Sequence, residues 1–141
     1  MASGGCGNGR RRLLLAWEVS ADQEEPWRRL LQELSDARRE EKEEGYVGSR
    51  RRLGISAESV WLVAKPLGGG MAVVYLQALD PQRALSELAA SEAPFDAWYS
   101  GRMRKLFGFD LAQVTRAASG ELLLAWREAP SEGEQKSPKR S

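Results

Sequence analysis

Apolar side chains recur along the chain with two periods, one typical of strands and one typical of helices. Residues 12–19 (RLLLAWEV) are mostly apolar on both alternating faces, which predicts a central strand covered on both sides. Residues 57–65 and 71–79 are two further apolar runs, and the three glycines between them predict a hairpin turn. Residues 120–127 (GELLLAWR) have the same apolar character and predict a fourth strand.

The two stretches between these strands have helical spacing. Residues 22–53 predict a helix with Pro26 in its first turn, and its charged part, 35–52, is either one helix or a helix and a loop. Asp80 and Pro81 form a strong start signal for a second helical region, which Pro94 divides. The apolar stripe of the first helix consists of Trp27, Leu30, Leu31 and Leu34.

The predicted order of elements is βαββαβ, which defines an α+β, ferredoxin-like fold. Such a fold has a four-stranded antiparallel sheet with helices on one face. Because the strands supply large apolar side chains to both faces, the second face is too apolar to meet water. We therefore expect a dimeric α/β barrel, in which the open sheet face meets a second copy or lines a ligand cavity. The domain is predicted over 10–128, between a disordered leader (1–9) and a disordered tail (129–141).

Composition removes several classes of site. The 141 residues include 21 Lys or Arg and 20 Asp or Glu, so no net charge favours a phosphate backbone or an anionic membrane. The chain has no His and one Cys, which removes the commonest general base, an internal disulfide and a Cys or His metal cluster. No apolar run is long enough to span a membrane, and the N-terminus lacks a signal pattern. We expect a cytoplasmic protein without metal or cofactor.

Four pieces of the sequence carry a resemblance to a protein family. They are RREEKEEGYVGSRRRLGI, ESVWLVAKP leading to MAVVYLQALDP, RALSELAASEAPFDAW and KLFGFDL, and together they cover about 27–111. The chain resembles an uncharacterised family of small bacterial proteins with a ferredoxin-like dimeric α/β barrel fold. The resemblance implies that fold and a homodimer, but it implies no activity and no catalytic residue. Members often carry His near the third piece, where this chain has Ala93 and Trp98.

Three side chains on predicted strands are candidates for a ligand site. If Trp61, Tyr75 and Gln77 face the open side of the sheet, they can line a pocket for a small apolar or aromatic ligand. The alternative is that the two rings belong to a dimer core, where Trp and Tyr are common. The sequence pattern leaves both interpretations open.

Three charged or aromatic positions add further candidates. Glu18 interrupts an apolar strand, where a buried carboxylate can serve as a general base, unless it is simply exposed or paired with an arginine. Trp98 and Arg102 lie in an aromatic helix followed by basic residues, which can hold an anionic ligand. The alternative for this helix is a solvated face, with Asp96 as a competing partner for the arginine.

Three classes of function remain open. The first is a non-catalytic dimer that binds a small ligand or serves as an accessory interaction module. The second is a cofactor-free oxygenase or isomerase acting on a small aromatic substrate, by analogy of fold alone. The third is RNA binding, suggested by the basic runs 10–12 and 50–52 but opposed by the third strand, which lacks the paired aromatics of RNA-binding sheets. No catalytic triad, carboxylate pair or ligand cluster can be assembled, so we expect the first class, with neither a membrane nor nucleic acid as partner.

Overall fold

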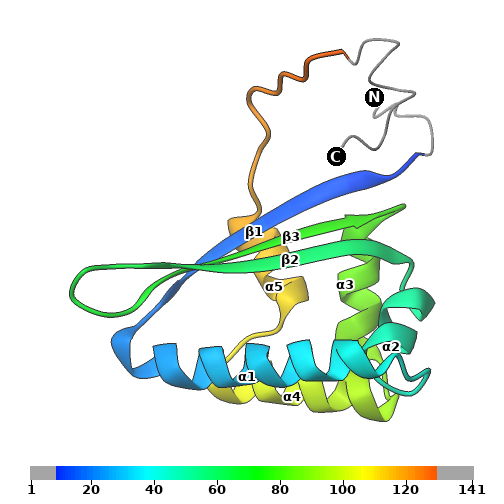
Figure 1. Cartoon of the computed structure of the whole chain (residues 1–141), viewed down its shortest axis with the longest axis horizontal. Helices are drawn as coiled ribbons and strands as arrows, with labels where there is room; N and C mark the ends of the chain where they lie inside the picture. Colours follow the sequence, from blue (N-terminus) through cyan, green and yellow to red (C-terminus); the bar gives the residue numbers. More distant parts are fainter. Residues whose placement is uncertain (1–8, 130–141) are drawn as a thin grey trace, which may run out of the picture.

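One antiparallel sheet carries all the described helices on one side, as the computed structural model of residues 9–129 shows (Figure 1). The strands are β1 (Arg11–Val19), β2 (Ile55–Ala64) and β3 (Gly70–Ala78), in the order β1-β3-β2. The helices are α1 (Ala21–Glu40), α2 (Tyr46–Arg52), α3 (Pro81–Ala90), α4 (Pro94–Phe107) and α5 (Leu111–Ala118). The strands predicted at 12–19, 57–65 and 71–79 are therefore confirmed, with small shifts at their ends. The expectation that 12–19 is a central strand covered on both sides is wrong, because β1 lies at one edge of the sheet and the helices cover only one of its faces.

The alternation of side chains along the strands places the core between the sheet and the helices. Leu13, Leu15, Trp17 and Val19 of β1 are buried on the helical side, opposite the alternate positions of the same strand. They pack with the predicted stripe of α1, of which Trp27 and Leu30 are almost fully buried. Aromatic rings in edge-to-face contact close one end of this core; they belong to Trp17, Trp27, Phe107 and Phe109.

The charged segment 35–52 contains a helix end, a turn and a second helix. α1 begins at Ser20, where a capping box with Gln23 satisfies its first N–H groups, and it ends at Glu41, which adopts a left-handed conformation with φ 54°. The chain then turns through 42–45 and forms α2, which brings Arg50 back to the core. Of the two arrangements left open by the sequence, the structure contains the helix followed by a loop and a short helix.

The expectation of a four-stranded ferredoxin-like sheet is wrong, and with it that of a dimeric α/β barrel built from such sheets. The sheet has three strands, and 121–129 form no regular element. An isolated bridge joins Leu15 to Ser119, and the Gly120 N–H donates to the Leu14 carbonyl at 2.6 Å. The chain then leaves β1 on the side opposite the helices (Figure 1).

The physical reason is the lack of cover on that side. GELLLAWR is apolar on both alternating faces, whereas the helices cover only one face of the sheet. Half of the side chains of 120–127 would therefore face water even if this segment paired with β1 of its own chain. Helix α5 was not predicted from the sequence; Asp110 is its N-cap and forms a capping box with Gln113.

The predicted leader 1–9 and tail 129–141 lie outside the described residues, apart from Gly9 and the residue at 129. Among the described helices, none combines the length and the apolar character needed to cross a bilayer.

Candidate functional site

The face of the sheet that carries no helices is a regular array of side chains from three strands, which we call the open face. The pairing of β1 and β2 with β3 arranges it in four rows. From one end to the other, the rows are Arg12, Gln77 and Ala57; Leu14, Tyr75 and Ser59; Ala16, Val73 and Trp61; Glu18, Met71 and Val63. The polar row at one end is therefore followed by rows that are mostly apolar.

The apolar rows of the open face are exposed to solvent. Leu14, Trp61, Val63 and Met71 expose between 40% and 58% of their surface. Single exposed apolar side chains are common on proteins, but a contiguous group of them usually marks a binding surface. The open face therefore has the character of an interface rather than of an ordinary solvated surface.

The segment 120–127, which we call the C-terminal segment, adds a second exposed apolar surface. Its four large apolar side chains expose between 68% and 85% of their surface. They are Leu122, Leu123, Leu124 and Trp126. The segment rises from the open side of the sheet rather than packing against it (Figure 1).

A groove of about 740 Å³ lies between the C-terminal segment and the polar end of the open face. Tyr75 and Gln77 form part of its floor, and three arginines without a carboxylate partner among the described residues line it. These arginines are Arg11, Arg12 and Arg127. The other lining residues are Arg10, Leu13, Leu14, Gly120, Glu121 and Leu122. Arginine guanidinium groups near an aromatic ring and an amide can hold a planar anion.

The structure brings three of the predicted site residues to the open face. Tyr75 and Gln77 lie in the groove, and Trp61 lies one row further along the face. Glu18 is at the opposite end of the face, where its side chain is exposed and accepts a hydrogen bond from Lys65 Nζ at 3.1 Å. The environment of Glu18 is thus a solvated strand end rather than a buried pocket.

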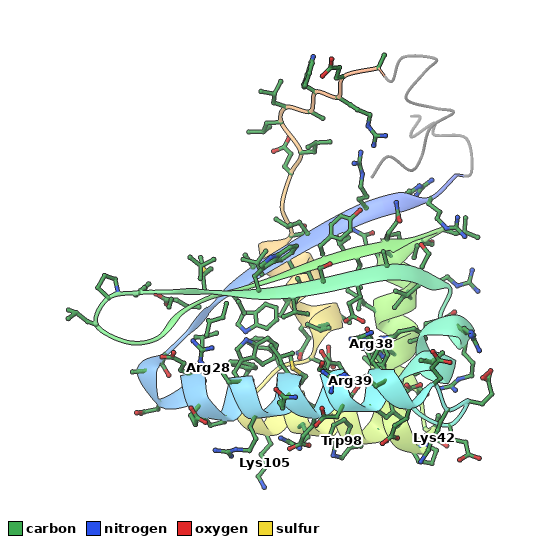
Figure 2. The ribbon with its side chains drawn as sticks, viewed as in Figure 1. Arg28, Arg38, Arg39, Lys42, Trp98 and Lys105 are labelled. Carbon is green, nitrogen blue, oxygen red and sulfur yellow. The ribbon has the colours of Figure 1, made fainter. Side chains whose placement is uncertain are left out.

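The two candidates on α4 lie elsewhere. Trp98 lies on the helical side of the molecule, away from the sheet (Figure 2). The Arg102 guanidinium stacks over the Trp98 ring at 5.4 Å and forms an ion pair with Glu33 of α1 at 2.9 Å. Trp98 and Arg102 therefore do not share a site with Tyr75 and Gln77.

A buried ion pair beneath β2 is a feature that sequence reasoning missed. The Arg50 guanidinium donates to Glu58 from Nε at 2.8 Å and from Nη2 at 3.4 Å, and both side chains are almost fully buried. Tyr46 also donates to Glu58, and the rings of Tyr46 and Tyr99 flank the guanidinium. Burial opposes the ionisation of Glu58, but the charge and hydrogen bonds of Arg50 outweigh it and lower the pKa of this carboxyl. The sequence signal that could have indicated this pair is Glu58, a carboxylate inside the apolar run 57–65.

A second buried carboxylate, Asp96, joins α2 to α4. It accepts hydrogen bonds from Ser49, from Ser91 at 2.6 Å and from Arg52 at 2.8 Å. Burial raises the pKa of Asp96, but these hydrogen bonds outweigh it and hold the pKa below its usual value. All its partners belong to the chain itself, so the arrangement locks α2 in place and leaves no position for a ligand.

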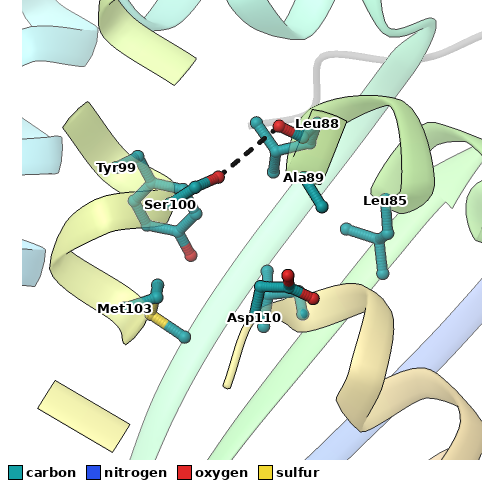
Figure 3. A pocket seen from close by; sticks show the side chains of 8 residues that line it. Leu85, Leu88, Ala89, Tyr99, Ser100, Met103 and Asp110 are labelled. Atoms are coloured by element: carbon teal, nitrogen blue, oxygen red, sulfur yellow. Dashed lines mark hydrogen bonds between the residues drawn. The ribbon is translucent and has the colours of Figure 1, made fainter. Parts of the chain in front are cut away.

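A second hollow lies among α3, α4 and the start of α5 (Figure 3). Apolar side chains such as Leu85, Leu88 and Met103 fill it, and the Ser100 hydroxyl donates to the Leu88 carbonyl at 3.5 Å. It contains no volume that a water molecule can occupy. The hollow is therefore part of the core rather than a binding site.

In the part of the chain that the structure describes, no group of three or more acidic, His or Cys side chains is placed to hold a metal ion. No protein-family model, no curated protein and no solved structure matches the chain. The resemblance to a family of small bacterial proteins therefore stays a prediction.

Proposed function

We propose that this chain is a non-catalytic binding module that holds a small planar anion in the groove of the single copy and forms a homodimer through its open face. The observation that carries the ligand proposal is the lining of the groove. Arg12 and Arg127, which have no carboxylate partner among the described residues, line it together with Tyr75 and Gln77. A ligand with an aromatic ring and a carboxylate matches these groups.

The size of the groove supports a small molecule as the ligand. Its volume of about 740 Å³ lies within the range of ordinary ligand sites. An aromatic ring can stack on Tyr75, a carboxylate can accept paired hydrogen bonds from Arg12 or Arg127, and Gln77 can both donate and accept.

The chemistry of the lining favours binding over catalysis. Arginine stays protonated in proteins, so it serves as neither a general base nor a nucleophile. Glu121 is the one carboxylate among the lining residues, and no described hydrogen bond links it to a nucleophilic side chain. Turnover of an aromatic substrate added to the pure protein would instead favour a cofactor-free oxygenase or isomerase.

The homodimer is supported by the exposed apolar rows of the open face. A second copy offers the same rows, and a two-fold axis brings the two faces together. Such an arrangement removes Trp61, Val63 and Met71 from water at once. Of the two aromatic rings proposed from the sequence, Tyr75 then lines the groove and Trp61 lies in the interface.

The ligand proposal is tested with 2-naphthoate as a probe and 2-naphthamide as its neutral counterpart, by isothermal titration calorimetry. We expect the carboxylate to bind at least about tenfold more tightly, because each charge-assisted hydrogen bond is worth about 1.5–3 kcal/mol. The double variant Arg12→Gln, Arg127→Gln should lose most of this preference. Arg38→Gln is the matched control, since Arg38 is an exposed arginine of α1 without an ion pair among the described residues (Figure 2).

Equal binding of the two probes, or an unchanged affinity of the double variant, would contradict the proposed ligand. Tight binding of a single-stranded RNA whose affinity falls steeply with salt would favour the third class of function instead.

A further inference from the structure

We propose that the C-terminal segment of each copy pairs, as an added strand, with the free edge of β2 in a second copy. This inference rests on the homodimer of the proposed function and names the element that joins the two chains. The groove belongs to the single copy, because the pairing moves 121–127 away from Tyr75 and Gln77. In a four-stranded sheet the segment would pair with β1 of its own chain. In the present proposal it pairs with β2 of another copy.

The C-terminal segment has the sequence of a strand without a partner. The pentapeptide LLLAW occurs at 13–17 and again at 122–126. At 13–17 it forms the middle of β1, which pairs with β3 and is covered by helices. At 122–126 the same residues form no described pairing, and their large side chains are exposed. The segment thus has the intrinsic preference for a strand but lacks a neighbour that satisfies it.

The chain's own β1 offers little to this segment. Ser119 and Gly120 already occupy the β1 edge at Leu14 and Leu15, and the chain leaves the edge there. If the segment continued this antiparallel pairing, only residues 11–13 of β1 would remain as partners. Three residues are too few for a stable ladder.

The free edge of β2 is long and unprotected. Over its 10 residues β2 pairs with β3 alone among the described strands. Exposed edges are usually blocked by lysine, proline or an inward-pointing charge that cannot be compensated. Residues 55–64 contain neither lysine nor proline, and the charge of Glu58 is neutralised by Arg50 beneath the sheet. This edge is therefore open to another strand.

The path from the C-terminal segment of one copy to the β2 edge of the other is short enough for the segment to span. If two open faces stack with the two-fold axis along the strands, the β1 edge of one copy lies above the β2 edge of the other. Stacked sheets are about 10 Å apart, and eight extended residues span roughly 26 Å. The C-terminal segment leaves β1 on the open side, which is the direction of the partner sheet (Figure 1). This stacking also places the large Trp61 over the small Ala16, and Leu14 over Ser59.

The exposed apolar area is large enough for such a dimer. The large exposed side chains of the open face and the C-terminal segment together offer roughly 1,000 Å² per copy, at about 200 Å² for a fully exposed large residue. A stable interface needs about 800 Å² from each partner, and the open face alone offers less than half of that. The C-terminal segment therefore supplies most of the area that a stable dimer requires.

The test compares Leu124→Lys with Leu67→Lys in the full chain. Leu124 is 85% exposed and Leu67, in the hairpin turn, is 97% exposed, so neither change disturbs the packing of a single copy. We expect Leu124→Lys to raise the dimer dissociation constant at least about 100-fold, because two buried leucines are lost in each dimer. Leu67→Lys should leave the constant unchanged. Sedimentation velocity over a range of concentrations measures both.

Amide hydrogen exchange locates the pairing. In the dimer, we expect slow exchange at 121–127 and at the β2 amides that do not bond to β3, and fast exchange at both after dilution to monomer. A dimer that Leu124→Lys leaves intact would overturn the strand pairing but keep the proposed interface through the open face. A wild-type chain that stays monomeric without ligand would overturn both, whereas binding of 2-naphthoate to the single copy is a separate test of the groove.

Discussion

The buried pair of Arg50 and Glu58 gives the sharpest stability prediction. Glu58→Gln keeps the shape of the side chain but removes its charge, which leaves the Arg50 guanidinium, 5% exposed, without a compensating anion. Removing one partner of a buried ion pair typically costs about 3–5 kcal/mol, because the remaining charge stays desolvated. For a domain stable by about 5–15 kcal/mol, this is a large part of the total.

The matched control is Glu33→Gln, which breaks the pair with Arg102. That pair has similar geometry, with one guanidinium nitrogen 2.9 Å from the carboxylate, but the two side chains are 32% and 41% exposed. Water and salt screen such a pair, so its loss should cost about 1 kcal/mol or less. The two variants thus differ mainly in the burial of the pair.

Urea denaturation followed by tryptophan fluorescence measures the difference. With a slope of about 2 kcal/mol per M, Glu58→Gln should lower the unfolding midpoint by about 2 M and Glu33→Gln by about 0.5 M or less. The double variant Arg50→Met, Glu58→Leu should recover most of the loss, because no buried charge then remains. Equal midpoints for Glu58→Gln and Glu33→Gln would show that burial does not set the cost of breaking the ion pair.

Two further predictions concern pH and close packing. Because their pKa values are lowered in the folded state, Glu58 and Asp96 stabilise the fold at neutral pH, and this contribution should be lost as pH falls below about 4. Asp96→Asn should therefore destabilise the protein more at pH 7 than at pH 3 in urea titrations, and an equal effect at both would contradict this. Gly48→Ala should lower the melting temperature, because its Cβ would lie 1.7 Å from the Glu43 carbonyl oxygen. Gly101→Ala in α4 has open space and should instead stabilise by about 0.5–1 kcal/mol; a gain from Gly48→Ala would contradict the packing.

The periodic parts of the fold could be predicted from the sequence, because their burial depends on local alternation. Leu13, Leu15 and Trp17 share one face of β1 as the pattern indicates, and the stripe of α1 is buried as expected. The segment 120–127 could not be predicted in the same way. Its composition indicates a strand, but whether a strand forms depends on a partner that lies outside the single chain.

The candidate site was predictable only in part. Alternation along β3 places Tyr75 and Gln77 on one face, and the structure adds the groove and its arginines. Trp98 and Arg102 could not be placed, because the orientation of α4 depends on its packing against α1. The pair of Arg50 and Glu58 spans a turn between α2 and β2, so no helical or strand period links the two residues.

Native mass spectrometry of the freshly purified full chain tests the proposed binding module, because it reports the number of subunits and any bound small molecule together. We expect a dimer, and a small acidic molecule retained only on single chains, in which the groove is present. A chain that stays monomeric at micromolar concentration and carries no ligand would contradict the proposed module, since the open face, the C-terminal segment and the groove would then all remain unoccupied.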